Sequence, residues 1–258
     1  MNWQFASALT IGDREEQQDR VAIIHPEACD GHLLVVADGM GGHKDGAMAA
    51  QTVIDIASSR INDSVIDDPN LLLKNICLDA HRAITDLNAD HASPPGSTCA
   101  ILYLKGNNAY CAHVGDSRLY QFRNGNLIHM TTDHSLAKLM EEHAIGGGSY
   151  QATQNQLYMC LGGSNEMTPE FFDTKVEPGD LFLLCSDGFW GQVDVERIFT
   201  ATNTNIIDEN YAEQLVQLAG KQGREKSDNI SLAMAYCKGD TRIRERRKFI
   251  NWFRKTVA

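Results

Sequence analysis

The 258-residue sequence has no long hydrophobic run. No stretch approaches the roughly 18 apolar residues that a bilayer-spanning helix needs. The first nineteen residues, MNWQFASALTIGDREEQQD, also lack the basic stretch and apolar core of a secretory signal. We therefore expect no membrane span, no signal peptide and a cytoplasmic protein.

Paired cysteines are also missing. The seven cysteines are odd in number, scattered along the chain and free of any CxxC motif. Such a set is typical of reduced thiols rather than of a disulfide framework or a zinc ribbon. Five of them stand in apolar runs and are expected to be small core residues: Cys77, Cys99, Cys111, Cys185 and Cys237.

Basic residues are in the minority, with 23 Lys and Arg against 34 Asp and Glu, for a net charge of −11. This acidity argues against sequence-independent nucleic-acid binding, which needs a basic surface. Residues 240–258 alone carry +5, which leaves −16 on residues 1–239. We expect a catalytic domain over 1–239 and a basic amphipathic C-terminal segment over 240–258. We favour a terminal helix packed on the acidic body over an interfacial or partner-docking helix.

Hydrophobic periodicity predicts an α+β fold. Short apolar runs predict strands at 21–24, 33–37, 98–104, 109–114, 119–122, 181–185 and 230–236, and the turn at 123–126 predicts a hairpin. Helical spacing predicts helices at 47–61, 71–87, 135–143 and 210–222. The strands come in hairpin-like groups, which favours antiparallel sheets with helices packed outside. The glycine-rich residues 145–165 are expected to form a mobile surface flap.

Aspartates recur at the ends of the predicted strands. Asp38, Asp116 and Asp187 follow apolar runs, and Asp228 stands just before one. Any one of these aspartates alone is most simply a turn residue. Four converging carboxylates would repel one another, and a divalent cation would remove that repulsion. A set of oxygen ligands suits Mg²⁺ or Mn²⁺ rather than Zn²⁺.

The glycine-rich stretch 38–43 (DGMGGH) follows a predicted strand and precedes a predicted helix. That position invites a nucleotide-binding interpretation. However, the glycine spacing does not match GxGxxG, and no Gly-Lys-Ser/Thr follows. We therefore set nucleotide binding aside.

An ordered series of short motifs covers residues 14–231 and resembles the bacterial branch of the metal-dependent type 2C protein Ser/Thr phosphatases, the PPM family. The motifs are Arg14 with Asp19, 38–43 (DGMGGH), 96–98 (GST), 115–118 (GDSR), 132–135 (TDHS), 186–188 (SDG) and 227–229 (SDN). The resemblance implies a four-layer αββα sandwich of two packed antiparallel sheets flanked by helices. It also implies two Mn²⁺ or Mg²⁺ ions, with a third in some members, bound in the cleft.

The resemblance assigns metal-binding roles to five residues. Asp38 would bridge the two ions, and the backbone carbonyl of Gly39 would bind one of them. Asp187 and Asp228 would bind the other ion. Asp116, together with Asp187, would hold the weaker third ion.

The resemblance also implies the reaction. Asp19 would orient a metal-activated water, and Arg14 would bind the substrate phosphate, although a lone Arg among acids is usually a surface charge. The water would attack phosphoserine or phosphothreonine in proteins without a phosphoenzyme, opposing a cognate Ser/Thr kinase, and we expect a monomer. A Cys-x5-Arg loop, as in tyrosine phosphatases, is absent, because Cys111 and Arg118 are separated by six residues.

The sequence departs from the family pattern in several places. Gln18 replaces a usual Glu and should weaken the second metal site, and Ala47 replaces another Glu. Met40 stands where eukaryotic members have a His that acts as general acid, and His43 is expected to pack or cap the loop. The flap lacks a His-Pro-x-Arg-Asn run and keeps only Gln154-Asn155 of it.

Two other functions fit the same motifs. The first is a pseudophosphatase that binds phosphoproteins without turnover, although the aspartates and Arg14 are present. The second is a metal-dependent hydrolase of a small phosphomonoester, which would use the same core.

Overall fold

The computed structural model describes residues 1–26, 31–41, 44–62, 66–87, 94–143, 156–163, 167–201, 207–223 and 227–238. Three predictions fall wholly or partly outside the described residues. His43 and the basic C-terminal segment 240–258 lie outside them, as do 145–155 and 164–165 of the predicted flap.

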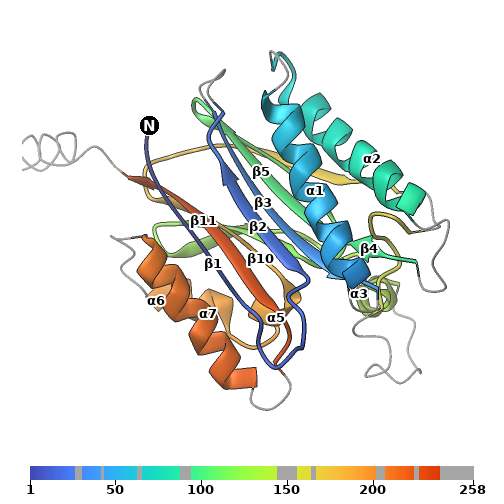
Figure 1. The fold of residues 1–258 in the computed structure, drawn as a ribbon. Helices are drawn as coiled ribbons and strands as arrows, with labels where there is room; N and C mark the ends of the chain where they lie inside the picture. Colours follow the sequence, from blue (N-terminus) through green and yellow to red (C-terminus); the bar gives the residue numbers. More distant parts are fainter. Residues whose placement is uncertain are drawn as a thin grey trace, which may run out of the picture.

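Two antiparallel sheets stacked on each other form the centre of the protein (Figure 1). Within the described residues, the first sheet has five strands, in the order β1 (Asn2–Thr10), β11 (Ile230–Lys238), β10 (Asp180–Cys185), β7 (Arg118–Arg123) and β8 (Asn126–Met130). The second sheet has six strands, β2 (Asp19–Ile24), β3 (Gly31–Met40), β5 (Cys99–Lys105), β6 (Asn108–Val114) and β9 (Glu170–Lys175), with β4 (Gly96–Ser97) paired to β3.

Helices cover the outer face of each sheet (Figure 1). The six-stranded sheet packs against α1 (Lys44–Asn62) and α2 (Pro69–Leu87). The five-stranded sheet packs against α5 (Asp187–Trp190), α6 (Val195–Ala201) and α7 (Glu209–Gly223). The short α3 (Leu136–Glu142) follows β8. The predicted α+β sandwich with helix, sheet, sheet and helix layers is confirmed.

The pattern of β3 shows why both faces of the sheet are buried. Leu33, Val35 and Ala37 pack towards the helices, whereas Leu34 and Val36 pack between the sheets. Alternate residues of a strand point to opposite faces, so a strand that is buried on both sides is apolar throughout. This explains why the apolar run is continuous up to Ala37, directly before Asp38.

The predicted strands and helices are present, with their ends shifted by up to three residues. One difference concerns the predicted loop at 38–43. β3 continues through Met40 because Gly39 and Met40 pair with Ser97 and Gly96 of β4. The sequence did not predict β1, β4, β9, α5 or α6.

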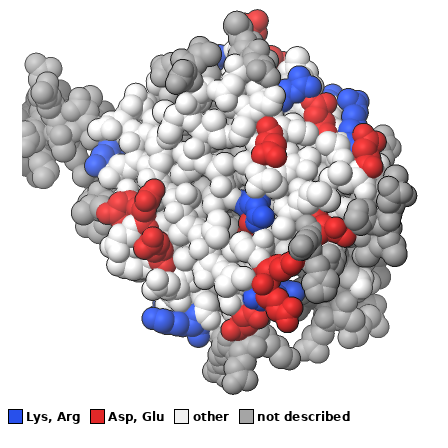
Figure 2. All heavy atoms as spheres, viewed as in Figure 1, with Lys and Arg blue, Asp and Glu red and all other residues white. Residues whose placement is uncertain are grey.

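The surface of the described part carries charges of both signs. Figure 2 shows acidic and basic side chains in small groups on the face viewed, several of them containing both signs, with uncharged surface between the groups. None of the described helices combines the length and the apolar character needed to cross a lipid bilayer.

Candidate functional site

The six-stranded sheet contributes two acidic residues that face each other. Asp19 of β2 and Asp38 of β3 are direct partners in the antiparallel register. The backbone of Asp38 is fixed by Thr98, whose hydroxyl accepts from the Asp38 N–H at 2.9 Å and whose N–H donates to the Asp38 carbonyl at 2.8 Å. Like charges directly opposite each other repel across a strand pair. The strand pairing therefore holds two carboxylates in an unfavourable juxtaposition.

The five-stranded sheet adds two more aspartates at one of its ends. Asp187 begins α5 just after β10, and Asp228 stands two residues before β11. These two strands pair antiparallel, with Cys185 opposite Leu232, so the end of β10 lies beside the start of β11. Asp116 comes from the loop in which the chain passes from β6, in one sheet, to β7, in the other.

Burial and mutual repulsion raise the pKa values of these carboxyls. Burial raises the pKa of Asp38 well above its usual value, and the charges of Asp19 and Asp187 raise it further. The pKa of Asp19 rises to about 7, chiefly through burial and against the lowering effect of its hydrogen bond from Ser186. Burial is the main cause, and the charge of a neighbouring aspartate the second, that raises the pKa of Asp116 to about 7 and that of Asp187 to about 6. These carboxyls are therefore buried close together, where their ionised forms are disfavoured.

The donor atoms of this cluster fit a hard divalent cation. Asp19 is 1% exposed, and its Oδ2 accepts from the Ser186 hydroxyl at 2.7 Å. The other oxygen of the same carboxyl, Oδ1, is buried and has no hydrogen-bond partner. An unsatisfied buried carboxylate oxygen among other carboxylates is costly unless a cation is present. Oxygen-only ligands are those that Mg²⁺ and Mn²⁺ prefer.

Gly39 lies where the backbone of β3 meets the start of α1. A Cβ atom at this position would lie 2.0 Å from the carbonyl oxygen of Gly46 and 2.9 Å from that of Gln18. Only glycine permits this approach. The side chain of Gln18 also lies against Gly46, so the amide that replaces the family's usual Glu is placed at the edge of the cluster.

The loop between β1 and β2 brings Arg14 to the site. Arg14 Nη2 donates to Asp228 Oδ2 at 2.7 Å, and the Arg14 side chain is 60% exposed. Asn229 fastens this loop, because its Nδ2 donates to the carbonyls of Ile11 at 2.8 Å and Glu16 at 3.0 Å. Sequence reasoning assigned no role to Asn229, although this residue belongs to the SDN motif.

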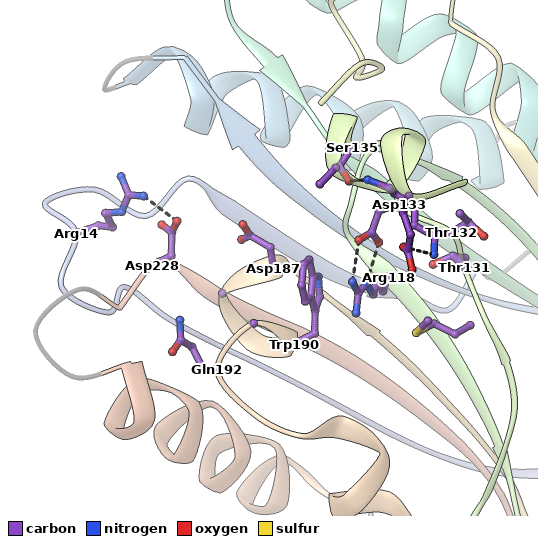
Figure 3. Close-up of a pocket in the computed structure, with 16 residues that line it drawn as sticks. Arg14, Arg118, Thr131, Thr132, Asp133, Ser135, Asp187, Trp190, Gln192 and Asp228 are labelled. Carbon is purple, nitrogen blue, oxygen red and sulfur yellow. Dashed lines mark hydrogen bonds and ion pairs between the residues drawn. The ribbon is translucent and has the colours of Figure 1, made fainter. Parts of the chain in front are cut away.

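A cavity of about 750 Å³ opens from the cluster (Figure 3). Arg14, Asp187 and Asp228 line one end of it, and Lys138 and Glu141 of α3 line another part. The candidate site therefore continues from the carboxylates into a hollow large enough for several side chains.

Trp190 stands between Asp187 and Arg118 in this cavity (Figure 3). The Arg118 guanidinium lies over the indole, 3.5 Å from the ring centroid, and binds Asp133 through two hydrogen bonds of 2.8 and 2.7 Å. The indole N–H donates to the backbone carbonyl of Asp116 at 2.9 Å. This network joins three separate segments, and apart from the GDSR and TDHS motifs no sequence signal points to it.

A second group of metal-ligand types lies apart from the aspartates. His113, His134 and Glu170 bring one ligand atom each within 4.8 Å of the others. However, His134 Nδ1 accepts from the Gly115 N–H at 3.1 Å, and His113 Nε2 lies 2.8 Å from the Thr132 carbonyl oxygen. Burial lowers the pKa of both imidazoles, to about 4 for His134. These rings are neutral groups that bind the backbone next to the site.

The structure thus gathers Asp19, Asp38, Asp116, Asp187 and Asp228 with Arg14 beside them, and the backbone carbonyl of Asp116 also accepts from Trp190. Gly39 lies at the same end of β3. The roles assigned to these residues in the reaction stay predictions.

Comparisons with known proteins agree on one kind of protein. The profile of a family described as Protein phosphatase 2C matches residues 10–219. Protein phosphatase PhpP of Streptococcus pneumoniae is 29% identical over 209 residues, which cover 78% of this chain and 84% of PhpP.

Solved structures extend this similarity to the fold. The S. agalactiae serine/threonine phosphatase gives a TM-score of 0.82 at 25% identity, covering 92% of this chain and 100% of that one. The catalytic domain of serine/threonine protein phosphatase PstP, in complex with two manganese ions, gives a TM-score of 0.77 at 27% identity. That match covers 92% of this chain and 99% of the other.

Proposed function

The chain belongs to the protein phosphatase 2C family, and from this premise we propose that it removes phosphate from phosphoserine and phosphothreonine in proteins with two Mn²⁺ or Mg²⁺ ions. The observation that carries the proposal is the buried, mutually repelling aspartate cluster with its unsatisfied Asp19 oxygen. Such a cluster suits divalent cations and sits beside an exposed arginine that can bind a phosphate.

Five residues would hold the ions. Asp38 would bridge the two, with the Gly39 carbonyl binding one and Asp187 and Asp228 the other, while Asp116 and Asp187 would hold a weaker third ion. The bound ions would lower the pKa of a water molecule and offset the negative charge of the phosphoryl oxygens.

The other residues of the site would bind and orient. Arg14 pairs with Asp228 in the structure, and its exposed guanidinium is free to turn towards a phosphate once Asp228 binds a cation. Asp19, held by Ser186, would accept a hydrogen bond from the attacking water and so direct it at phosphorus. Met40 carries no acidic proton, so the side chain at that position cannot protonate the leaving alkoxide.

The biological setting follows from the proposed reaction. We propose phosphorylated proteins as substrates, a Ser/Thr kinase as the opposing activity, a cytoplasmic location and a monomer. The catalytic domain would cover 1–239, since β1 and β11 pair along their whole length, and 240–258 would be an appended segment. A pseudophosphatase is not favoured, because the five aspartates and Arg14 are all present.

Turnover of a phosphothreonine peptide with Mn²⁺ or with EDTA tests the proposal. We expect EDTA to abolish turnover and Asp38→Asn or Asp187→Asn to lower it by more than about 100-fold, since even outer-shell partners of a metal cost about 10–100-fold. Asp173→Asn, on the exposed side of the edge strand β9, is the matched control and should leave turnover unchanged.

Three outcomes would contradict parts of the proposal. No Mn²⁺-dependent turnover of either a phosphopeptide or a chromogenic phosphoester would exclude the enzyme. A rate that EDTA leaves unchanged would exclude the metals. A small phosphomonoester that turns over much faster than any phosphoprotein would favour the alternative substrate class.

A further inference from the structure

The cavity next to the aspartates has a second part that no step of the proposed reaction uses. This part is lined by the end of β8, the start of α3 and the indole of Trp190. We call it the flank subsite and define it by Met130, Ala137, Lys138, Glu141 and Trp190. Of these, Trp190 is labelled in Figure 3.

The charges around the flank subsite are balanced. Arg118 binds Asp133 with two hydrogen bonds, and Lys138 Nζ lies 2.8 Å from Glu141 Oε2. Apart from Arg14, Asp187 and Asp228 at the reaction end, the described residues that line the cavity carry no other charge. A charged side chain entering this part would lose water without finding an unpaired opposite charge.

The same part offers apolar surface from Met130 and Trp190, of which the indole is held in place. Met130 is 40% exposed, on the edge strand of its sheet. Trp190 is held on one side by the Arg118 guanidinium and by its hydrogen bond to the Asp116 carbonyl. Because the indole is already immobilised, contact with it costs little additional conformational entropy.

We propose that the flank subsite binds a residue within two positions of the phosphorylated Ser or Thr of a protein substrate and selects an uncharged, apolar side chain there. The proposal rests on the proposed phosphatase function, which puts the phosphate at the Arg14 and Asp187 end. Successive residues of an extended chain are about 3.3–3.6 Å apart. A chain that enters the cavity at the reaction end can therefore place a residue one or two positions away further along the same cavity.

Mutation of the Lys138–Glu141 ion pair on α3 should change which flanking residue is preferred. Removing Lys138 would leave Glu141 unpaired and attract a basic flanking residue, and removing Glu141 would leave Lys138 to attract an acidic one. Both side chains are partly exposed, at 38% and 62%, so these effects are modest and fall as salt increases.

The test uses four sets of phosphothreonine peptides, one set for each of the two positions before and the two positions after the phosphorylated residue. Within a set, the peptides differ only at that position, which is Leu, Ala, Glu or Lys. In one of these sets, we expect the wild-type kcat/KM for the Leu peptide to exceed that for the Glu and Lys peptides by about three- to tenfold, where tenfold corresponds to about 1.4 kcal/mol. Lys138→Ala should raise the Lys-to-Glu ratio by about two- to fivefold and Glu141→Ala should lower it by a similar factor.

Met130→Ala should reduce the Leu-to-Ala ratio. Ile128→Ala is the matched control, because Ile128 is 50% exposed on the same strand but does not line the cavity, and it should leave every ratio unchanged. The opposite shifts expected of the two α3 variants could not arise from a general loss of folding.

The outcomes separate this inference from the function on which it rests. If Mn²⁺-dependent turnover is robust but kcat/KM is the same whichever residue flanks the phosphothreonine, the flank subsite alone is overturned. The same follows from a wild-type preference for a charged flank, or from identical shifts in the two α3 variants. Absence of turnover on every phosphoester overturns the proposed function and this inference with it.

Discussion

A single hydroxyl links the two sheets at the aspartate cluster. Ser186, which follows β10, donates to Asp19 of β2 at 2.7 Å and accepts from the Ser231 N–H at 3.0 Å. Ser186 is fully buried, so its bond to Asp19 is shielded from water. The bond leaves one Asp19 oxygen, Oδ1, without a protein partner. Ser186 is therefore a positioning residue for the carboxyl proposed to orient water.

Ser186→Ala should weaken both the fold and the cation site. Leaving a buried acceptor unsatisfied costs about 1–3 kcal/mol, which urea unfolding would detect. Loss of an outer-shell partner should weaken Mn²⁺ binding by about 10–100-fold in isothermal titration calorimetry. Ser231→Ala removes a hydroxyl that donates to Ser186 Oγ at 3.3 Å and that lowers the pKa of Asp19 less than Ser186 does. It keeps the bond between Ser186 and Asp19, so it should have the smaller effect. Unchanged Mn²⁺ affinity in Ser186→Ala would refute the positioning role.

The difference between Asp38 and Ser186 shows what the sequence reveals at this scale. Asp38 directly follows an apolar run, so its place at a strand end can be predicted from local pattern. The partner of Ser186 is 167 residues away in the chain, and it depends on how the two sheets pack. The roles of Trp190 and Asn229 cannot be predicted from local pattern either, because their hydrogen bonds join segments that only the tertiary fold brings together.

At the scale of elements, two glycines set how closely strands approach their neighbours. A Cβ at Gly39 would lie 2.0 Å from the Gly46 carbonyl oxygen, and one at Gly188 would lie 2.0 Å from that of Asn229. Both neighbours are backbone atoms, which cannot rotate aside as a side chain can. These contacts fix α1 against β3 and α5 against β11, and so fix the aspartates that these elements carry.

Gly39→Ala should therefore displace the start of α1. We expect a loss of about 1–3 kcal/mol or more in unfolding free energy, as in overpacked cores, together with weaker Mn²⁺ binding. Gly220→Ala in α7 is the matched control, since its Cβ would meet only Ile230 Cδ1 at 3.7 Å. Replacing a helix-interior glycine should stabilise the protein by about 0.5–1 kcal/mol. Equal unfolding free energies in the two variants would contradict this account.

The predictability of elements follows their burial. Central strands such as β3, β5 and β10 are apolar on both faces and were predicted within a few residues. The edge strand β9 (EFFDTK) is exposed or half-buried at every residue, so no apolar pattern marks it. Its strand conformation comes from pairing with β6, which is a tertiary effect. α5 has only four residues, too few for helical periodicity to show.

The molecule as a whole brings acidic groups from both sheets to one place. Asp19 and Asp38 come from the six-stranded sheet, Asp187 and Asp228 from the five-stranded one, and Asp116 from the connection between them. The net charge of −11 is thus concentrated in part at a site that needs cations. Bound Mn²⁺ or Mg²⁺ would reverse the local sign that an incoming phosphate meets.

This concentration of acids predicts how the stability of the whole protein depends on pH without metal. The folded-state pKa values of Asp19 and Asp116, about 7, and of Asp187, about 6, lie above the ordinary 3.8. The folded protein then binds more protons than the unfolded chain between about pH 4 and 7, so the contribution of these groups to stability falls as pH rises across this range and is fully lost above about pH 7. In EDTA, Tm should fall between pH 5.5 and 8, by about 2–4 °C for each kcal/mol lost.

Mn²⁺ should restore Tm most strongly at pH 8, where the carboxylates are ionised and repel one another without a cation. Differential scanning calorimetry across this pH range, with Mn²⁺ and with EDTA, measures both effects. Asp187→Asn removes one of the carboxyls with a raised pKa and should make the fall in EDTA shallower. A Tm in EDTA that stays level or rises from pH 5.5 to 8 would mean that the aspartates do not repel one another in the folded protein. In that case the cations would be needed for the reaction but not to hold the two sheets together at the site.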